Sequence, residues 1–167
     1  FKHCKSYIGL EIESENKNFA DFTYDGKNFP FEDETFDSAI CSEVLEHVFE
    51  PNQFLREINR VLKKNGLIIL TLPFFWDEHE QPYDYARYTS FGLTHILQKN
   101  GFRVILLKKT TPYFLTIIQM TSAYFYQHVL PSNRLLRTIL ALLIVSPMNI
   151  LGLVLNNFFP KNFDFYH

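Results

Sequence analysis

Short apolar runs alternate with stretches of helical periodicity along the first two thirds of the chain. The apolar runs lie at residues 7–12, 20–24, 36–42, 66–73 and 102–109. Continuous apolar runs of this length are typical of parallel strands that are covered on both faces. We therefore predict five strands, and the run at 66–73 is the strongest of them.

Two stretches between these runs place their apolar residues on one helical stripe. The stretch at residues 51–66 begins with Pro51, which suits a first helical turn, and ends with Gly66, which suits a helix exit. The stretch at 89–102 begins with a hydroxyl residue that can cap it and ends at an Asn-Gly pair. This alternation predicts an α/β fold with a doubly wound, mostly parallel Rossmann-like sheet, which is incomplete in this chain.

The last third of the chain has a different pattern. No formal charge occurs between residues 110 and 133 or between residues 138 and 160. We predict an α/β core at residues 1–110 and an apolar helical hairpin at residues 111–167, packed on the core or on a partner. The apolar run at 138–155 is long enough for a membrane-spanning helix. Its Ser, Pro, Asn and Gly residues weaken that interpretation. A helix in the membrane interface and a true span stay open as alternatives.

Composition narrows the class of protein. The 167 residues carry a formal net charge of −2, so the chain lacks the excess positive charge that is typical of nucleic-acid-binding proteins. The two cysteines, Cys4 and Cys41, lie far apart in the sequence and outside any metal-binding spacing, and two cysteines do not suggest a disulfide framework. This composition favours a reducing, cytoplasmic setting. No signal peptide is evident at the amino end. Residues 111–160 are the expected surface for peripheral membrane contact or for a homo-oligomer.

Polar side chains follow the predicted strands where each one ends. Parallel strands bring their carboxyl ends to one edge of a sheet, and ligands bind there. Glu11 ends the first apolar run, and its carboxylate can accept hydrogen bonds from both hydroxyls of a ribose. Glu13, by contrast, lies in a polar loop. Asp25 can accept a hydrogen bond from an exocyclic amine, and Gly26 allows close backbone approach, although Asp-Gly is also a common plain turn.

The stretches "YDGKNFPFEDETFDSAICSEVLEHV" and "FLREINRVLKKNGLIILTLPF" strongly resemble the class I S-adenosylmethionine-dependent methyltransferases of the type 11-like family. The run "HEQPYDYARYTSFGLTHILQKNGF" is similar to a segment of some bacterial members. The resemblance covers about residues 7 to 109. Phe29 stands where the family usually has Leu, and Asn65-Gly66 where it has Gly-Gly. The Gly-rich loop of the family has no counterpart, so the chain is expected to begin just before the second family strand.

The resemblance implies S-adenosyl-L-methionine as cofactor and methyl transfer to a small-molecule, glycan or lipid-linked acceptor. Glu11 would bind the ribose, Asp25 and Gly26 the adenine, and Ser42 and Glu43 would line the pocket near the methionine portion. On the acceptor side, His47 and His79 would serve as catalytic groups that take a proton near neutral pH. The substrate-binding residues there would be Glu46, Tyr83, Arg87 and Tyr88.

Several alternatives stay open at this point. His47 can merely tether the start of the following helix, and Arg87 can pair with Asp84 at helical spacing rather than with an anionic acceptor. The Glu46-His47 pair lacks two further obvious ligands, so no metal site is predicted. A nicotinamide oxidoreductase is disfavoured because no G-x-G-x-x-G occurs. A non-catalytic methyltransferase-like scaffold is the main alternative function.

Overall fold

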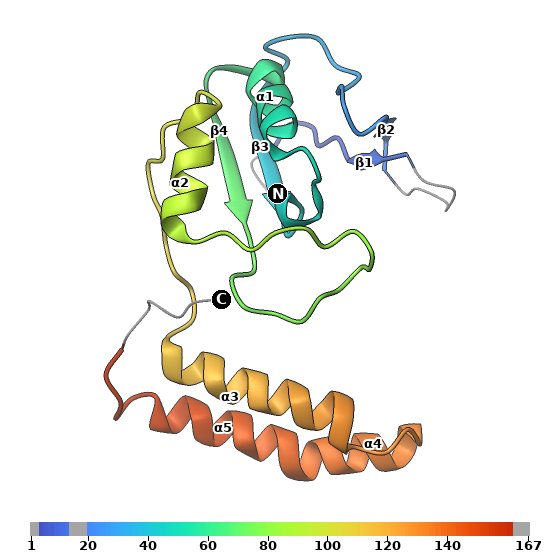
Figure 1. Ribbon diagram of the computed structural model, residues 1–167, viewed down its shortest axis with the longest axis vertical. Helices are drawn as coiled ribbons and strands as arrows, with labels where there is room; N and C mark the ends of the chain where they lie inside the picture. Colours follow the sequence, from blue (N-terminus) through green and yellow to red (C-terminus); the bar gives the residue numbers. More distant parts are fainter. Residues whose placement is uncertain (1–3, 14–19, 162–167) are drawn as a thin grey trace. The chain divides into compact units, whose positions relative to one another are not determined.

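The computed structural model describes residues 4–13 and 20–161. These residues fall into two compact units. The first unit lies within residues 1–72 and 79–105, and the second comprises Pro73–Glu78 and the chain from Leu106 onward. The strands belong to the first unit, and the C-terminal helices belong to the second (Figure 1).

The strands of the first unit form two parallel pairs. Strand β1 (Leu10–Ile12) pairs with β2 (Phe22–Tyr24). Strand β3 (Phe36–Ser42) pairs with β4 (Leu62–Thr71), and Ser42 lies opposite Thr71. The predicted α/β class with parallel strand pairing is therefore confirmed.

Two details of the predicted sheet are wrong. The pairs β1–β2 and β3–β4 are separate two-stranded sheets rather than one continuous sheet. Residues 102–109 do not form the predicted fifth strand: the described structure assigns them to no strand and to neither sheet. Ile105 and Leu106 within this segment are exposed.

Helix α1 (Pro51–Val61) begins at Pro51 as predicted but ends five residues before Gly66. The chain enters β4 directly at Leu62, and the pairing register shifts between Phe36 and Ser38 on the partner strand. The segment after Leu62 is a bulge in β4, where Asn65 takes a positive φ of 64°. Gly66 is packed so closely there that an added Cβ would lie 2.9 Å from the carbonyl oxygen of Lys63.

One apolar core organises the first unit. Helix α2 (Ser90–Lys99) is capped by Thr89, whose hydroxyl oxygen accepts from Gly92 N at 3.1 Å, and it shares this core with α1 and the short 3₁₀ turn η1 (Leu45–His47). The core residues are Phe29, Leu45, Leu55, Ile58, Val61, Leu62 and Leu97. Strand residues such as Ala39 and Ile68 pack against this core, whereas Ile40 and Ile69 lie on the opposite, exposed face of the β3–β4 pair.

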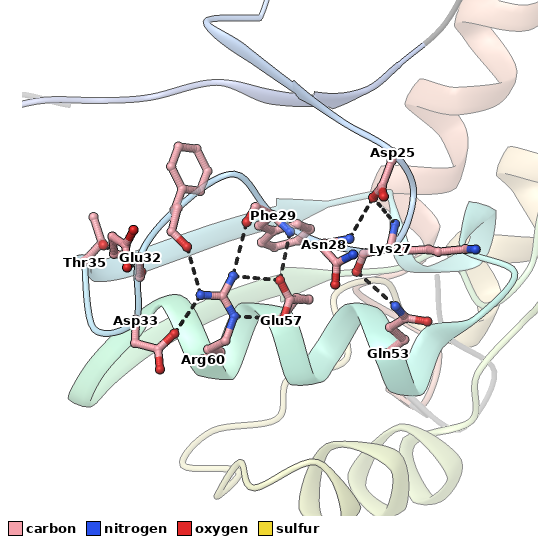
Figure 2. A network of polar contacts seen from close by, with 11 residues as sticks. Asp25, Lys27, Asn28, Phe29, Glu32, Asp33, Thr35, Gln53, Glu57 and Arg60 are labelled. Carbon is pink, nitrogen blue, oxygen red and sulfur yellow. Dashed lines mark hydrogen bonds and ion pairs between the residues drawn. The ribbon is translucent and has the colours of Figure 1, made fainter.

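A polar network ties the loop before β3 to helix α1 (Figure 2). The Arg60 guanidinium donates to both carboxylate oxygens of Glu57 at 2.8 Å and to Asp33 Oδ1 at 2.7 Å. It also donates to the carbonyl oxygens of Phe31 at 2.8 Å and Phe29 at 3.2 Å. Glu57 accepts in turn from Phe29 N at 2.8 Å, and the Arg60 hydrogen bond holds the pKa of Glu57 below its ordinary value.

The second unit contains the predicted C-terminal helices. Helix α3 (Tyr113–Tyr124) continues into a π-helical segment (Phe125–Val129), and α4 (Arg134–Leu140), a second π-helical segment (Ala141–Val145) and α5 (Ser146–Leu155) follow. Helices α3 and α5 pack together: Ser122 Oγ lies 2.9 Å from Asn149 Oδ1, and a Cβ on Gly152 would lie 2.7 Å from Ile118.

The helical run from Arg134 to Leu155 is long and apolar enough to cross a membrane, by length and composition alone. Its 22 residues include a window with a mean hydropathy of 2.3, of which only 6% is buried in the structure. Core helices of soluble proteins that pass the same test are mostly buried, and this run is not. The interfacial and spanning alternatives for this hairpin therefore stay open.

Candidate functional site

The residues predicted for the adenosine part of a cofactor lie on and after the β1–β2 pair. Glu11 is the middle residue of β1 and lies opposite Thr23 of β2. Asp25 follows β2 and its Oδ1 accepts from the backbone N–H groups of Lys27 and Asn28, at 2.8 Å each. These hydrogen bonds hold the pKa of Asp25 below its ordinary value.

The Asp25-Gly26 pair thus forms a turn, which is the plain alternative that the sequence left open. Gly26 has a φ of 81°, in the left-handed region that favours glycine. One Asp25 oxygen is engaged by the turn, and the other is not used by these two hydrogen bonds. The turn therefore orients Asp25 without consuming both of its acceptor atoms.

Tyr24 of β2 and Cys41 of β3 interact electrostatically. Burial, and then the charges of Glu11, Cys41 and Asp25, raise the pKa of Tyr24 to about 12. The Cys41 thiol is buried, and its pKa is raised to about 12 by burial and by the charge of Glu46. Cys41 of β3 is therefore within electrostatic range of both Tyr24 and Glu46.

The carboxyl ends of β3 and β4 are tied together as the parallel pairing requires. Ser42 Oγ lies 2.8 Å from Thr71 Oγ1, and Glu43 N donates to the Thr71 carbonyl oxygen at 3.0 Å. Glu43 has a φ of 51°, an uncommon conformation for a residue with a side chain. The chain therefore turns sharply at Glu43 and leads directly into the 3₁₀ turn η1.

Three side chains predicted for the acceptor side come together after this turn. Glu46 is fully buried, and neither carboxylate oxygen has a hydrogen-bond partner. Burial raises the pKa of Glu46 above its ordinary value. His47 Nε2 lies 3.1 Å from His79 Nε2 and 3.9 Å from Glu46 Oε1. The structure thus supplies a third polar group, His79, beside the Glu46-His47 pair.

The segment from His79 to Tyr88 is held against η1 by its backbone. Tyr85 N and Ala86 N donate to the Glu46 carbonyl oxygen at 2.8 and 3.2 Å. His47 Nδ1 lies 2.9 Å from the carbonyl oxygen of Tyr83, whose side chain is exposed. The tyrosine Tyr88 packs against the core, and burial raises its pKa.

Arg87 has the structural partner that the sequence left as an alternative. Its guanidinium donates to both Asp84 oxygens, with Nη2 lying 2.7 Å from Oδ2. This pair holds the pKa of the Asp84 carboxyl well below its usual range. Asp84 Oδ2 also accepts from His79 N at 3.0 Å and lies 3.4 Å from His79 Nδ1. Asp84 therefore positions His79 through contacts to its backbone N–H and to its imidazole.

Comparison with known proteins agrees with the resemblance carried by the motifs. The family described as "Methyltransferase domain" matches residues 2–70. An uncharacterized protein of Methanocaldococcus jannaschii is 35% identical over 69 residues, which cover 38% of this chain and 34% of that protein. The chain thus spans about a third of the length of the curated relative it matches.

Solved structures with partial similarity include two methyltransferase-related chains. One comes from the complex between the Haloferax volcanii Trm112 methyltransferase activator and a candidate methyltransferase. It has 22% identity, a TM-score of 0.47, and coverage of 54% of this chain and 43% of that chain. The other is a Thermotoga maritima S-adenosylmethionine-dependent methyltransferase, with 23% identity, a TM-score of 0.41, and coverage of 49% and 45%.

The family match begins before β1 and ends at Leu70 within β4, so it includes both parallel strand pairs and helix α1. It also includes most of the residues singled out at the strand ends: Glu11, Asp25, Gly26, Ser42, Glu43, Glu46 and His47. The chain is therefore similar to the methyltransferase domain family over residues 2–70.

Proposed function

We propose that the protein is an S-adenosylmethionine-dependent methyltransferase that acts on a small-molecule, glycan or lipid-linked acceptor. The observation that carries this proposal is the family match over residues 2–70, which contains the acidic strand-end residues expected to hold the cofactor. Part of the family's cofactor site, the Gly-rich loop, has no counterpart in this sequence.

The proposed reaction is an in-line displacement at the methyl carbon of a sulfonium. The bond from sulfur to the methyl carbon breaks and its electron pair stays on sulfur, while a lone pair of the acceptor forms the new bond. The donor is already activated, so the protein mainly aligns donor and acceptor and excludes water. The carboxylate of Glu43 near the methionine portion would favour the positive sulfonium.

Cofactor recognition is proposed to rest on the β1–β2 end of the first unit. Glu11 would accept the ribose hydroxyls. Asp25 would accept the adenine amine through the oxygen that the turn does not use, and Gly26 would let the backbone approach the base. On the acceptor side, His47 and His79 would act on the proton that an oxygen or nitrogen acceptor loses.

Glu11→Ala is expected to weaken binding of S-adenosylhomocysteine by roughly 1–3 kcal/mol, because a hydrogen-bonded contact to the ligand is lost. Isothermal titration calorimetry of the purified protein measures this change. Glu13→Ala is the matched control: Glu13 is an exposed acid two residues away, and its removal should leave the affinity within error.

Equal affinities of the Glu11 and Glu13 variants would remove Glu11 from the proposed pocket. No binding of S-adenosylhomocysteine by the unmodified protein would instead favour the non-catalytic scaffold. His79→Ala tests the acceptor side of the site separately from the cofactor side. It should lower turnover without changing cofactor affinity.

The second unit is proposed to associate with a membrane surface. Its exposed aliphatic side chains, among them Leu135, Leu142, Leu143 and Leu151, support this proposal, as does the low burial of the run Arg134–Leu155. Such association would place the protein at the cytoplasmic face of a membrane and would suit a lipid-linked acceptor. Packing on a protein partner or on a second copy through residues 111–160 is the competing arrangement.

In a liposome flotation assay, the protein is expected to float with vesicles, and Leu143→Glu is expected to reduce the floating fraction severalfold. A charge in place of an inserted leucine raises the cost of burying that helix face in lipid. Leu106→Glu is the control, since Leu106 is exposed but lies outside the helices. A protein that stays in the lipid-free fraction and elutes as a dimer would point to self-association instead.

A further inference from the structure

The three polar side chains beyond η1 form a compact cluster of metal-ligating groups. One ligand atom each from Glu46, His47 and His79 lies within 4.8 Å of the others. The two imidazole rings are perpendicular, with centroids 4.7 Å apart, and they meet through their Nε2 atoms at 3.1 Å. All three residues belong to the first unit.

The groups that contact Nδ1 of each histidine determine which tautomer that histidine adopts. His47 Nδ1 lies 2.9 Å from the carbonyl oxygen of Tyr83, and a carbonyl oxygen can only accept a hydrogen bond. His79 Nδ1 lies 3.4 Å from Asp84 Oδ2, and the Asp84 carboxylate is paired through both of its oxygens with the Arg87 guanidinium. Nδ1 of His47 therefore carries the proton and its Nε2 presents a lone pair, and the nearby Asp84 carboxylate favours the same tautomer in His79.

Two facing lone pairs at 3.1 Å repel unless a positive charge lies between or beside them. The Glu46 carboxylate adds to this requirement, because it is 0% exposed and neither oxygen has a hydrogen-bond partner. A buried carboxyl group whose oxygens both lack a partner is costly in either protonation state. A single cation bound by the two nitrogens and the carboxylate would satisfy all three groups.

We propose that Glu46, His47 and His79 bind a divalent transition-metal ion, with zinc as the ion that their mixed nitrogen and oxygen donors suit best. In a tetrahedral zinc site, two ligand nitrogens lie about 3.3 Å apart, close to the spacing of the two histidines. The Tyr83 carbonyl and the Asp84 carboxylate would hold the imidazoles by their outer nitrogens, as outer partners of metal-bound histidines do.

Three protein ligands leave a further coordination position open, which is the arrangement of a catalytic rather than a structural zinc site. An acceptor hydroxyl bound there would have a lowered pKa and would release its proton to water before attack on the methyl group. The two histidines would then promote loss of the acceptor's proton indirectly, by holding the metal ion to which the acceptor binds. This role rests on the proposed methyl transfer, whereas the metal site itself does not.

The test titrates metal-free protein with Zn²⁺ by calorimetry, and with Co²⁺ by visible absorption, in the absence of any S-adenosyl compound. We expect one ion per chain and Co²⁺ bands of the intensity that tetrahedral coordination produces. His47→Ala, His79→Ala and Glu46→Gln should each weaken binding by more than about tenfold. His95→Ala is the matched control, since His95 is an exposed histidine of α2 outside the cluster.

His79→Gln and Asp84→Asn test the same site without changing buried Glu46, in case a substitution there prevents folding. Both should weaken Zn²⁺ binding in a protein whose circular dichroism is unchanged. No binding by the unmodified protein would overturn the proposal and leave a proton shared by the two Nε2 atoms as the compensating charge. Binding that persists at full strength in all the ligand variants would overturn it too. Because no cofactor enters these titrations, a failed methyltransferase assay leaves their outcome unaffected.

Discussion

Leu55→Ala is expected to lower the free energy of unfolding by about 2–5 kcal/mol, the range seen when a fully buried leucine is truncated. Leu55 is 0% exposed and lies on the buried side of α1 with Ile58 and Val61. Truncation removes apolar area from the core and leaves a cavity that closely packed neighbours fill only in part. Urea unfolding followed by circular dichroism measures the loss.

Leu106→Ala is the control for this substitution, because Leu106 is 82% exposed and the same change should cost less than about 0.5 kcal/mol. Leu55→Met should be tolerated, at a cost below about 1.5 kcal/mol, since it conserves volume. Equal effects of alanine at Leu55 and Leu106 would mean that α1 does not pack as the structure describes. Hydrogen exchange of the α1 amides would locate the destabilised region.

Arg60→Ala is expected to cost about 2–4 kcal/mol, because several hydrogen bonds to a charged group are lost together. Without Arg60, the carboxylate of Glu57 keeps only the Phe29 N–H among the partners of this network (Figure 2). The carbonyl oxygens of Phe29 and Phe31 also lose the guanidinium. The same unfolding measurement detects the change.

Arg56→Ala is the matched control, since Arg56 is an exposed arginine of the same helix. Arg60→Lys should fall between the two, because an ammonium cannot reproduce the planar fork of the guanidinium. Asp33→Asn should cost little, since Asp33 is largely exposed and an exposed ion pair contributes weakly. A loss at Arg60 no larger than at Arg56 would show that the network does not stabilise the loop before β3.

Local signals in the sequence located most elements of the first unit. Pro51 predicted the start of α1, and the Thr89 cap predicted the start of α2, because both signals act within one helical turn. The end of α1 was misplaced because a Gly after a helical stripe usually marks a helix exit, whereas Gly66 lies in a bulge of β4. That difference depends on the pairing with β3, which no local pattern encodes.

The predicted strand at residues 102–109 also shows that a local pattern does not determine strand pairing. Its apolar run has the composition of a strand, but a strand needs a neighbour with free backbone groups. Among the residues that the structure describes, no strand pairs with this segment. Apolar composition alone therefore predicted a strand where the structure has none.

The candidate site was predictable only in part. Parallel pairing implied that the ends of β3 and β4 meet, and Ser42 and Thr71 do so. The burial of Glu46 could not be anticipated, because glutamate is rarely buried without a partner. The contact between His47 and His79 joins residues 32 positions apart and depends on how the 79–88 segment folds back.

The buried position of Cys41 has a practical consequence for labelling. At pH 8 a thiol with a pKa of about 12 is ionised in only about one molecule in ten thousand, and thiolate is the species that alkylating reagents attack. Cys4, the other cysteine, is exposed. A maleimide dye should therefore mark the folded protein at a single position near its amino end, which makes the native chain suitable for fluorescence work without removing a cysteine.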